Sequence, residues 1–424
     1  RASQVSGAET IGEIEARLKR LHRENPFSKL YSCPASSNDI PDEQTVRLVI
    51  LRPEDTYIRA KGKDGGRAMT AVSDYLNMRG IFPRVYRNML AFVAPDQDKL
   101  PDLQAEVKRF IAWKTIITDK DDLNLDGGQL REAESSLRRS NHSVESKMKE
   151  TYCWLLVPFI DQYEDIKTIQ WEISNLGGGE DEIVSKAAKK MIQGEQIITT
   201  WAPALLKMSL DEFLWKDADD ISIKRLWEYL CTYCYLPRLA NHSVLEDAII
   251  KGARSTEFFG IAAGYSGERY IDLKLNETVY SLNSSDLLVK PAAAMKQRAE
   301  ERTSAGQDGG PLDASHMIAG KESGGQLAAA GEQGRRGDGA GNETAARHTR
   351  FCMSVKLDNT RVNKNMNDYL TEVIQHLMGV EGAAVELTLE VSVTAPGGIP
   401  ASTVRVVSEN CRTLKIQDFH FTDD

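Results

Sequence analysis

The chain lacks a phosphate-binding loop. In the P-loop pattern G-x-x-x-x-G-K-[ST], backbone N–H groups surround the phosphates of a nucleotide and the Lys reaches them. The nearest approaches are Gly65-Gly66-Arg67 and Gly320-Lys321-Glu322, and neither has this spacing or the hydroxyl-bearing residue. We therefore expect the chain on its own neither to bind nor to hydrolyse ATP, and we assign it no catalytic residue and no cofactor.

Cysteine is also scarce, with six residues in 424, at positions 33, 153, 231, 234, 352 and 411. They are too few and too dispersed for a disulfide framework. The one close pair, Cys231 and Cys234, falls in an apolar helical pattern, so both are expected in a core. The seven histidines are widely spaced, and none pairs with a second His or Cys at ligand spacing. The sequence therefore predicts no metal site and no metal hydrolase.

Long apolar runs are missing too: no stretch reaches about 18 apolar residues, and the N-terminus has no charged-then-apolar signal pattern. We therefore expect a cytoplasmic chain without a membrane partner. The balance of 53 Lys and Arg against 62 Asp and Glu gives a formal charge of -9. That balance argues against a dominant nucleic-acid footprint, although it leaves room for a local basic patch. The chain begins at Arg1 rather than Met, so a fragment is expected.

What is present predicts a mixed α/β and α+β, multidomain fold. Residues 1–125 contain two apolar runs of strand length, 45–51 and 89–94, each followed by a helical pattern. The order strand, helix, strand, helix implies a parallel α/β unit. From 128 to 157 the apolar residues keep a helical stripe over about seven turns, and residues 126–220 are expected to form a helical connector.

Residues 221–292 predict a winged-helix-like segment. One helical pattern runs from Ser222 to about Leu236 and stops at Pro237, and a second begins at Ser243. Two short strands then flank the turn from Gly264 to Gly267. Helix, helix, hairpin is the order of a winged helix.

The last part of the chain changes in character. Eleven of its 31 glycines fall between 306 and 341, which predicts a flexible, Gly-rich linker over 293–349. Residues 350–424 return to alternating strand patterns separated by helical ones, and they predict a small C-terminal α+β domain.

Several stretches of the chain resemble one protein family, in the same order and across nearly the whole length. They are "IPDEQTVRLVILRPED", "RGIFPRVYRNMLAFVAPD", "KRFIAWKTI", "TYCWLLVPF", "LWEYLCTYCYLPRL" with "VLEDAIIKGA", "LLVKP" and "VRVVSENCRTLKI". These stretches are similar to AAA-like P-loop ATPases of prokaryotic anti-phage islands, the group with domain of unknown function 499, related to the ATPase of BREX-type defence.

The resemblance implies the part that follows the main nucleotide-binding motifs of a much larger, oligomeric protein. ATP and Mg are expected for that parent protein. The implied partners are the rest of the ATPase and other defence-system proteins, with double-stranded DNA as a further candidate.

The stretch "FPRVYRN" offers polar groups next to the strand 89–94. Arg84 or Arg87, presented to a neighbouring subunit, would stabilise transition-state charge on a phosphoryl group, and Asn88 would position the attacking water. Asp96 and Asp98 follow the carboxyl end of the same strand, where ligands of open α/β sheets bind. The alternative is that these side chains solvate the strand ends and pair with one another.

The charge of the winged-helix-like segment bears on DNA binding. Residues 221–275 hold seven basic and six acidic side chains, and a net charge of about +1 is weak for binding that depends on phosphate neutralisation. Lys251, Arg254 and Arg269 would be the contacts to DNA or to a partner. We expect a non-catalytic regulatory and interaction portion of a DNA-associated ATPase; completion of a neighbour's ATPase site in trans and DNA tethering remain open alternatives.

Overall fold

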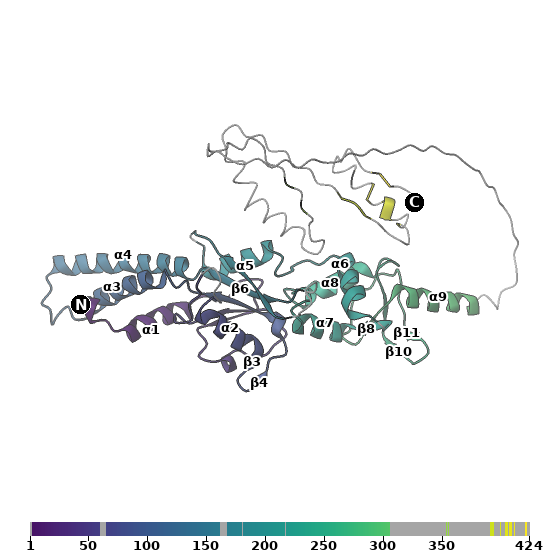
Figure 1. The fold of residues 1–424 in the computed structure, drawn as a ribbon, viewed down its shortest axis with the longest axis horizontal. Helices are drawn as coiled ribbons and strands as arrows, with labels where there is room; N and C mark the ends of the chain where they lie inside the picture. The colour runs from purple at the N-terminus through teal and green to yellow at the C-terminus, as the bar shows by residue number, and fades with distance from the viewer. Residues whose placement is uncertain are drawn as a thin grey trace, which may run out of the picture. The chain divides into compact units, whose positions relative to one another are not determined.

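A computed structural model gives the fold. It describes residues 2–59, 65–161, 168–179, 181–216 and 218–305, together with scattered residues between 353 and 421. The chain divides into two compact units, Arg1–Met366 and Asn367–Asp424. The helices and strands named below all belong to the first unit, which is mixed α/β, as the sequence predicts (Figure 1).

A five-stranded mixed sheet forms the centre of the first part of this unit. Its strands are β1 (Lys29–Ser32), β2 (Arg47–Ile50), β5 (Leu90–Ala94), β6 (Trp154–Phe159) and β7 (Gln170–Asn175), and they lie in the order β1-β2-β5-β6-β7. The first three are parallel, whereas β6 and β7 pair antiparallel with their neighbours. The predicted parallel strand-helix-strand unit is therefore present as β2, α2 and β5.

Helices cover both faces of this sheet, which explains why its inner strands β2, β5 and β6 are apolar at every position except Arg47. Leu48, Ala91 and Leu155 point to a core shared with α1 (Gly7–Leu18), α3 (Leu100–Thr118), α4 (Gly127–Thr151) and α5 (Ile183–Gln193). The alternating residues Val49 and Phe92 point to a second core with α2 (Arg67–Asn77). Burial of each large side chain in these cores contributes about 1.5–3 kcal/mol.

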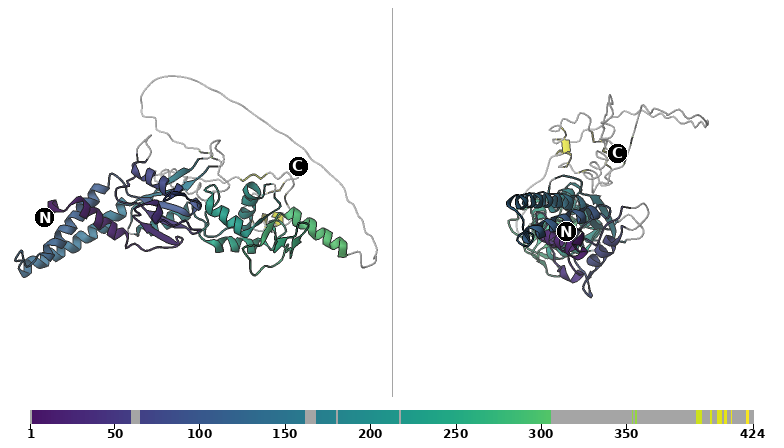
Figure 2. Two further views of the ribbon diagram at one scale, coloured as in Figure 1. Left: turned by 90° about the horizontal axis from the view of Figure 1, so that it is seen from below. Right: turned by 90° about the vertical axis from the view of Figure 1, so that its left-hand side faces the viewer.

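The helices α3 and α4 form a long antiparallel pair that runs past the end of the sheet, with α1 alongside (Figure 2). Arg17 of α1 contacts both: its guanidinium lies 4.4 Å from the ring centroid of Phe110 on α3, and Nη2 donates to Asn141 Oδ1 on α4 at 2.7 Å. The helix α4 begins with a capping box, in which Asp126 accepts from the backbone of Gln129.

A three-stranded antiparallel sheet lies in the second part of the unit. Its strands are β8 (Asp220–Ser222), β9 (Gly260–Ala262) and β12 (Leu287–Val289), in the order β8-β12-β9. The helices around it are α6 (Pro203–Ser209), α7 (Ile223–Thr232), α8 (His242–Gly252) and α9 (Pro291–Ala305), and a small hairpin projects as β10 (Gly264–Tyr265) and β11 (Tyr270–Ile271). Another small hairpin, β3 (Met78–Arg79) with β4 (Phe82–Pro83), follows α2 in the first part.

Local sequence explains the start of the two central helices of this second part. Ser222 accepts a hydrogen bond from the backbone of Arg225 and caps α7, while Asn241 accepts from Val244 and caps α8. Leu230 of α7 and Ile249 of α8 belong to the same core as the residues on one face of the large sheet. The two parts of the unit therefore share one continuous core.

Three expectations need correction. The predicted helix from 128 to 157 ends at Thr151, because the chain turns into β6, and Leu155 lies in a strand. The predicted helical connector 126–220 contains β6 and β7, so the large sheet crosses the predicted boundary at 125. The predicted linker starts inside α9, so residues 293–305 are helical. The rest of that linker and most of 350–424 lie outside the described residues.

The close cysteine pair lies in the core, as predicted. Cys231 is fully buried and Cys234 is 6% exposed, and burial raises the pKa of both thiols. Within the described ranges, no helix is long and apolar enough to cross a membrane.

Candidate functional site

The Arg84 side chain is buried and binds backbone groups of its own chain. Its side chain is 0% exposed and donates to the backbone carbonyls of Tyr75 at 2.7 Å, Ile40 at 2.9 Å and Pro41 at 3.1 Å. Asp42 lies 3.8 Å away. Burial lowers the pKa of the Arg84 guanidinium, and Asp42 opposes that shift. These contacts fix the loop before β5 and leave no face of the guanidinium toward solvent.

Asn88 likewise binds inside the unit. It is 1% exposed, and its Nδ2 donates to the carbonyl oxygens of Leu230 at 2.8 Å and Leu236 at 3.1 Å. Arg87, its neighbour, is half-buried, and its Nε has no hydrogen-bond partner in the part of the chain that the structure describes. Two of the residues suggested for a neighbour's ATPase site, Arg84 and Asn88, therefore hold loops of this chain together.

Arg238 completes the connection from the other side. Its guanidinium donates to three buried backbone carbonyls: Nε to Asn88, Nη1 to Gln196 at 2.8 Å and Nη2 to Pro158 at 2.9 Å. We call Asn88 and Arg238 the amide-guanidinium clamp. It joins the large sheet to the segment that follows α7, and its only signal in the sequence is a pair of polar residues in apolar surroundings.

Asp96 and Asp98 follow the carboxyl end of β5, as expected. The Asp96 carboxylate accepts from the Trp154 indole N–H at 2.8 Å and from the backbone of Asp98 at 2.9 Å and Lys99 at 3.2 Å. Asp96 thus closes the turn into α3. Because Asn88 precedes β5 and Asp96 follows it, these two candidates lie at opposite ends of one strand and do not form a common site.

The candidate contacts of the second part differ from one another. Lys251 and Arg254 are exposed at the end of α8, and neither makes an ion pair or hydrogen bond with the described residues. Arg269 instead pairs with Glu301 of α9 at 2.6 Å. The structure therefore leaves two of the three predicted cations available on α8 and ties the third to a helix.

Large apolar side chains are exposed in the same part. Tyr265 and Ile271, on the β10–β11 hairpin, are 52% and 51% exposed, and Tyr280 in the following loop is 89% exposed. Acidic residues stand among them, namely Glu268, Asp272 and Glu277. This combination is less suited to a phosphate backbone than to a protein surface.

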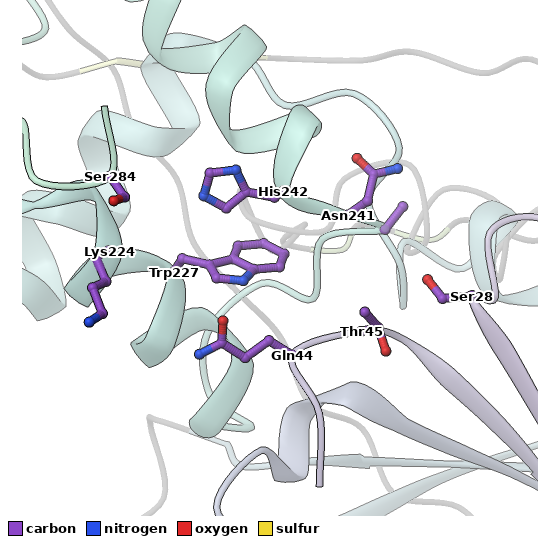
Figure 3. A pocket seen from close by; sticks show the side chains of 9 residues that line it. Ser28, Gln44, Thr45, Lys224, Trp227, Asn241, His242 and Ser284 are labelled. Atoms are coloured by element: carbon purple, nitrogen blue, oxygen red, sulfur yellow. The ribbon is translucent and has the colours of Figure 1, made fainter. Parts of the chain in front are cut away.

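A cavity of about 500 Å³ lies where the two parts of the unit meet. Ser28, Gln44 and Thr45 come from the large-sheet part, just before β1 and β2 begin. The remaining lining residues come from α7, the start of α8 and the loop before β12; they are Lys224, Trp227, Ala240, Asn241, His242 and Ser284 (Figure 3). We call this space the junction cavity. It lies at the amino ends of the two parallel strands, opposite the end where Asp96 was expected to act.

His242 and Trp227 form the centre of its lining. The imidazole meets the indole ring edge-on, with centroids 5.0 Å apart and an interplanar angle of 83°. His242 Nδ1 lies 3.1 Å from Glu246 Oε1, so Nε2 is the ring nitrogen left for other contacts. Asn241 uses its Oδ1 to cap α8 and to accept from Ser243, and its amide N–H groups make no hydrogen bond with the residues that the structure describes.

Sequence reasoning missed the junction cavity because its walls come from segments about 180 residues and more apart, such as Ser28 and Lys224. Among the described residues, no group of three or more His, Cys, Asp or Glu side chains is placed to hold a metal ion. Comparison of the chain with protein-family models, with curated proteins and with solved structures found no match.

Proposed function

We propose that the chain is a non-catalytic interaction portion of a DNA-associated ATPase, of the kind found in anti-phage defence, and that residues 221–292, together with the preceding helix α6, form a winged-helix-like module within it. The observation that carries the proposal is the order of elements. A helix (α6), a strand (β8), two helices (α7 and α8), a strand (β9), a projecting hairpin and a strand (β12) follow one another, and β12 pairs between β8 and β9.

The surface of this module favours a protein partner, namely the rest of the same ATPase. Its hairpin and the following loop expose Tyr265, Ile271 and Tyr280 among acidic side chains. Aromatic residues of this kind are enriched at protein interfaces. The large sheet, joined to the module by the amide-guanidinium clamp, would then move with it as one body.

Association with the remainder of the ATPase tests this proposal. Tyr265→Ser and Tyr280→Ser should each weaken binding by about tenfold, because removal of an interface aromatic costs more than about 1 kcal/mol. The matched control is Ile81→Ser, which changes an equally exposed apolar residue, 83% exposed, on the β3–β4 hairpin. Unchanged affinity in both tyrosine variants, measured by titration calorimetry, would refute docking through this hairpin and loop.

One observation supports a second candidate, DNA tethering through α8. The exposed side chains of Lys251, in the last turn of α8, and Arg254, just after it, have no partner among the described residues, and α8 corresponds to the helix that a winged helix places on DNA. The double change Lys251→Glu with Arg254→Glu separates the two functions. If the module docks on a protein, any weak duplex binding by the double variant should keep the salt dependence of the wild type. If α8 tethers DNA, the slope of log affinity against log salt concentration should flatten by roughly 0.9 per lost phosphate contact.

A further inference from the structure

We propose that the junction cavity binds a small phosphorylated molecule. Its volume of about 500 Å³ falls within the range of sites for small organic ligands, roughly 300–1,000 Å³. None of its nine lining residues is an Asp or Glu, whereas Lys224 supplies a cation. The lining therefore selects for negative charge.

Several donors in the lining have no partner among the described residues, whereas Gln44 Nε2 donates to Tyr86 and Thr45 Oγ1 donates to Glu43. Within the described residues, no hydrogen bond is made by Lys224 Nζ, by the hydroxyls of Ser28 and Ser284, or by the amide N–H groups of Asn241. A phosphate group has enough oxygens to accept from several donors at once, which a single carboxylate does less well.

Trp227 provides an independent observation. The residue is only 7% exposed, yet its indole N–H makes no hydrogen bond with the described residues. The N–H edge of the ring faces the side of the cavity where Gln44 lies (Figure 3). The indole nitrogen itself is not fully enclosed, so an oxygen of an anionic ligand in the cavity could accept a hydrogen bond from it.

Two carboxylates next to lining residues have partners of their own. Glu246 lies against His242 Nδ1, and Glu43, which accepts from Thr45 Oγ1 at 3.5 Å, pairs with Lys29 at 2.8 Å. The hydrogen bond from Lys29 lowers the pKa of Glu43. The helix α8 also begins at the cavity, and its backbone N–H groups at that end attract anions.

The position of the cavity gives such a ligand a role beyond the docking function. Ser28 and Thr45 belong to the large-sheet part, whereas Lys224 and His242 belong to the module that carries α8. A phosphate held by both sides would stabilise the junction that the clamp already joins, so the ligand would raise the stability of the folded unit.

Titration of the full chain with inorganic phosphate at constant ionic strength tests the proposal. The ¹H–¹⁵N spectrum contains indole signals from six Trp residues, and Trp227→Phe identifies the one to follow. We expect that signal to shift saturably. Lys224→Gln should weaken phosphate binding by about tenfold, and Lys251→Gln, a matched exposed lysine on α8, should leave it unchanged.

Three results would overturn the proposal. The first is that the Trp227 signal fails to shift. The second is that the two lysine variants weaken phosphate binding equally, which would show a general charge effect. The third concerns the source of the phosphate: a short DNA duplex shifts the Trp227 signal while inorganic phosphate does not, which would assign the cavity to a nucleic-acid backbone. A saturable response to phosphate without a response to duplex supports the small-molecule site.

Discussion

Asn88 and Arg238 each donate hydrogen bonds from their side chains to the backbone of the segment that carries the other residue. Arg238 Nε donates to the backbone carbonyl of Asn88, and the Asn88 side-chain amide donates to the carbonyls of Leu230 and Leu236. Both residues are buried: Arg238 is 6% exposed and Asn88 is 1% exposed. Each residue thus satisfies backbone acceptors that would otherwise be buried without a donor, and this makes the pair a connection between the two parts of the unit.

We expect truncation of the Arg238 side chain to lower the free energy of unfolding strongly. Arg238→Ala leaves three buried carbonyls without donors, so the free energy of unfolding should fall by about 3–5 kcal/mol. Arg238→Lys should recover only part of this, because an ammonium lacks the planar fork that reaches three acceptors. Urea denaturation measures both variants. The matched control is the exposed Arg254→Ala, expected within about 0.5 kcal/mol of wild type; equal losses at 238 and 254 would contradict the clamp.

A double-mutant cycle tests whether the two residues act together. The changes Asn88→Ala and Arg238→Ala affect the same junction, so their combined effect should differ from the sum of the single effects by about 0.5–3 kcal/mol. Pairing Arg238→Ala with Thr115→Ala, a residue of α3, gives the control cycle, and there the effects should add. Additive losses in the Asn88 cycle would show that the two side chains stabilise the junction independently.

Two glycines make a matched pair for packing. A Cβ on Gly252, at the end of α8, would lie 2.5 Å from Cζ of the buried Phe259 ring, whereas a Cβ on Gly12 of α1 would meet nothing within 4 Å. Gly252→Ala should therefore destabilise the protein by about 1–3 kcal/mol. Gly12→Ala should stabilise it by up to about 1 kcal/mol, because alanine is the better helix former. The midpoint of thermal unfolding should move in opposite directions; movement in the same direction would count against the packing described at Phe259.

Stability should fall in alkaline solution, partly through Cys33. Burial raises the pKa of this thiol from 9.0 to about 12. The unfolded chain loses the proton first, so the contribution is complete below pH 9 and is lost as the pH rises toward 12. Cys33→Ala should remove up to about 1.4 kcal/mol per pH unit from the slope of stability against pH in this range.

Unfolding free energies measured between pH 8 and 11 under reducing conditions check this slope. Other buried groups contribute to the wild-type curve, among them Tyr75, whose pKa burial raises to about 12. Cys411→Ala, in the second unit, serves as the control and should leave the slope of the first unit unchanged. An unaltered slope in Cys33→Ala would show that the thiol does not stay protonated in the folded chain.

The sequence predicts the parts of this fold that depend on local pattern. The apolar runs that became β2 and β5, and the helix-helix-hairpin order around α7 and α8, are visible because periodicity and turn residues report local conformation. The strand β6 was missed because Leu155 continues the helical spacing of Met148 and Tyr152, although the chain leaves the helix at Thr151.

The site was harder to predict than the fold. Arg84 and Asn88 stood out as polar residues beside a strand, but only the structure shows that backbone carbonyls from elsewhere, such as that of Leu230, occupy their donors. The junction cavity depends on how two distant segments pack, and no pattern within either segment indicates the other.

The long helix α4 has a mechanical consequence. Its 25 residues span about 37 Å at the usual rise per residue, and through Tyr152 and Cys153 it continues directly into β6, an inner strand of the sheet. The carbonyl of Pro158 near the other end of β6 accepts a hydrogen bond from Arg238. A force applied at the free end of the α3–α4 pair would therefore be transmitted through α4, β6 and the Arg238 guanidinium to the segment that carries α8.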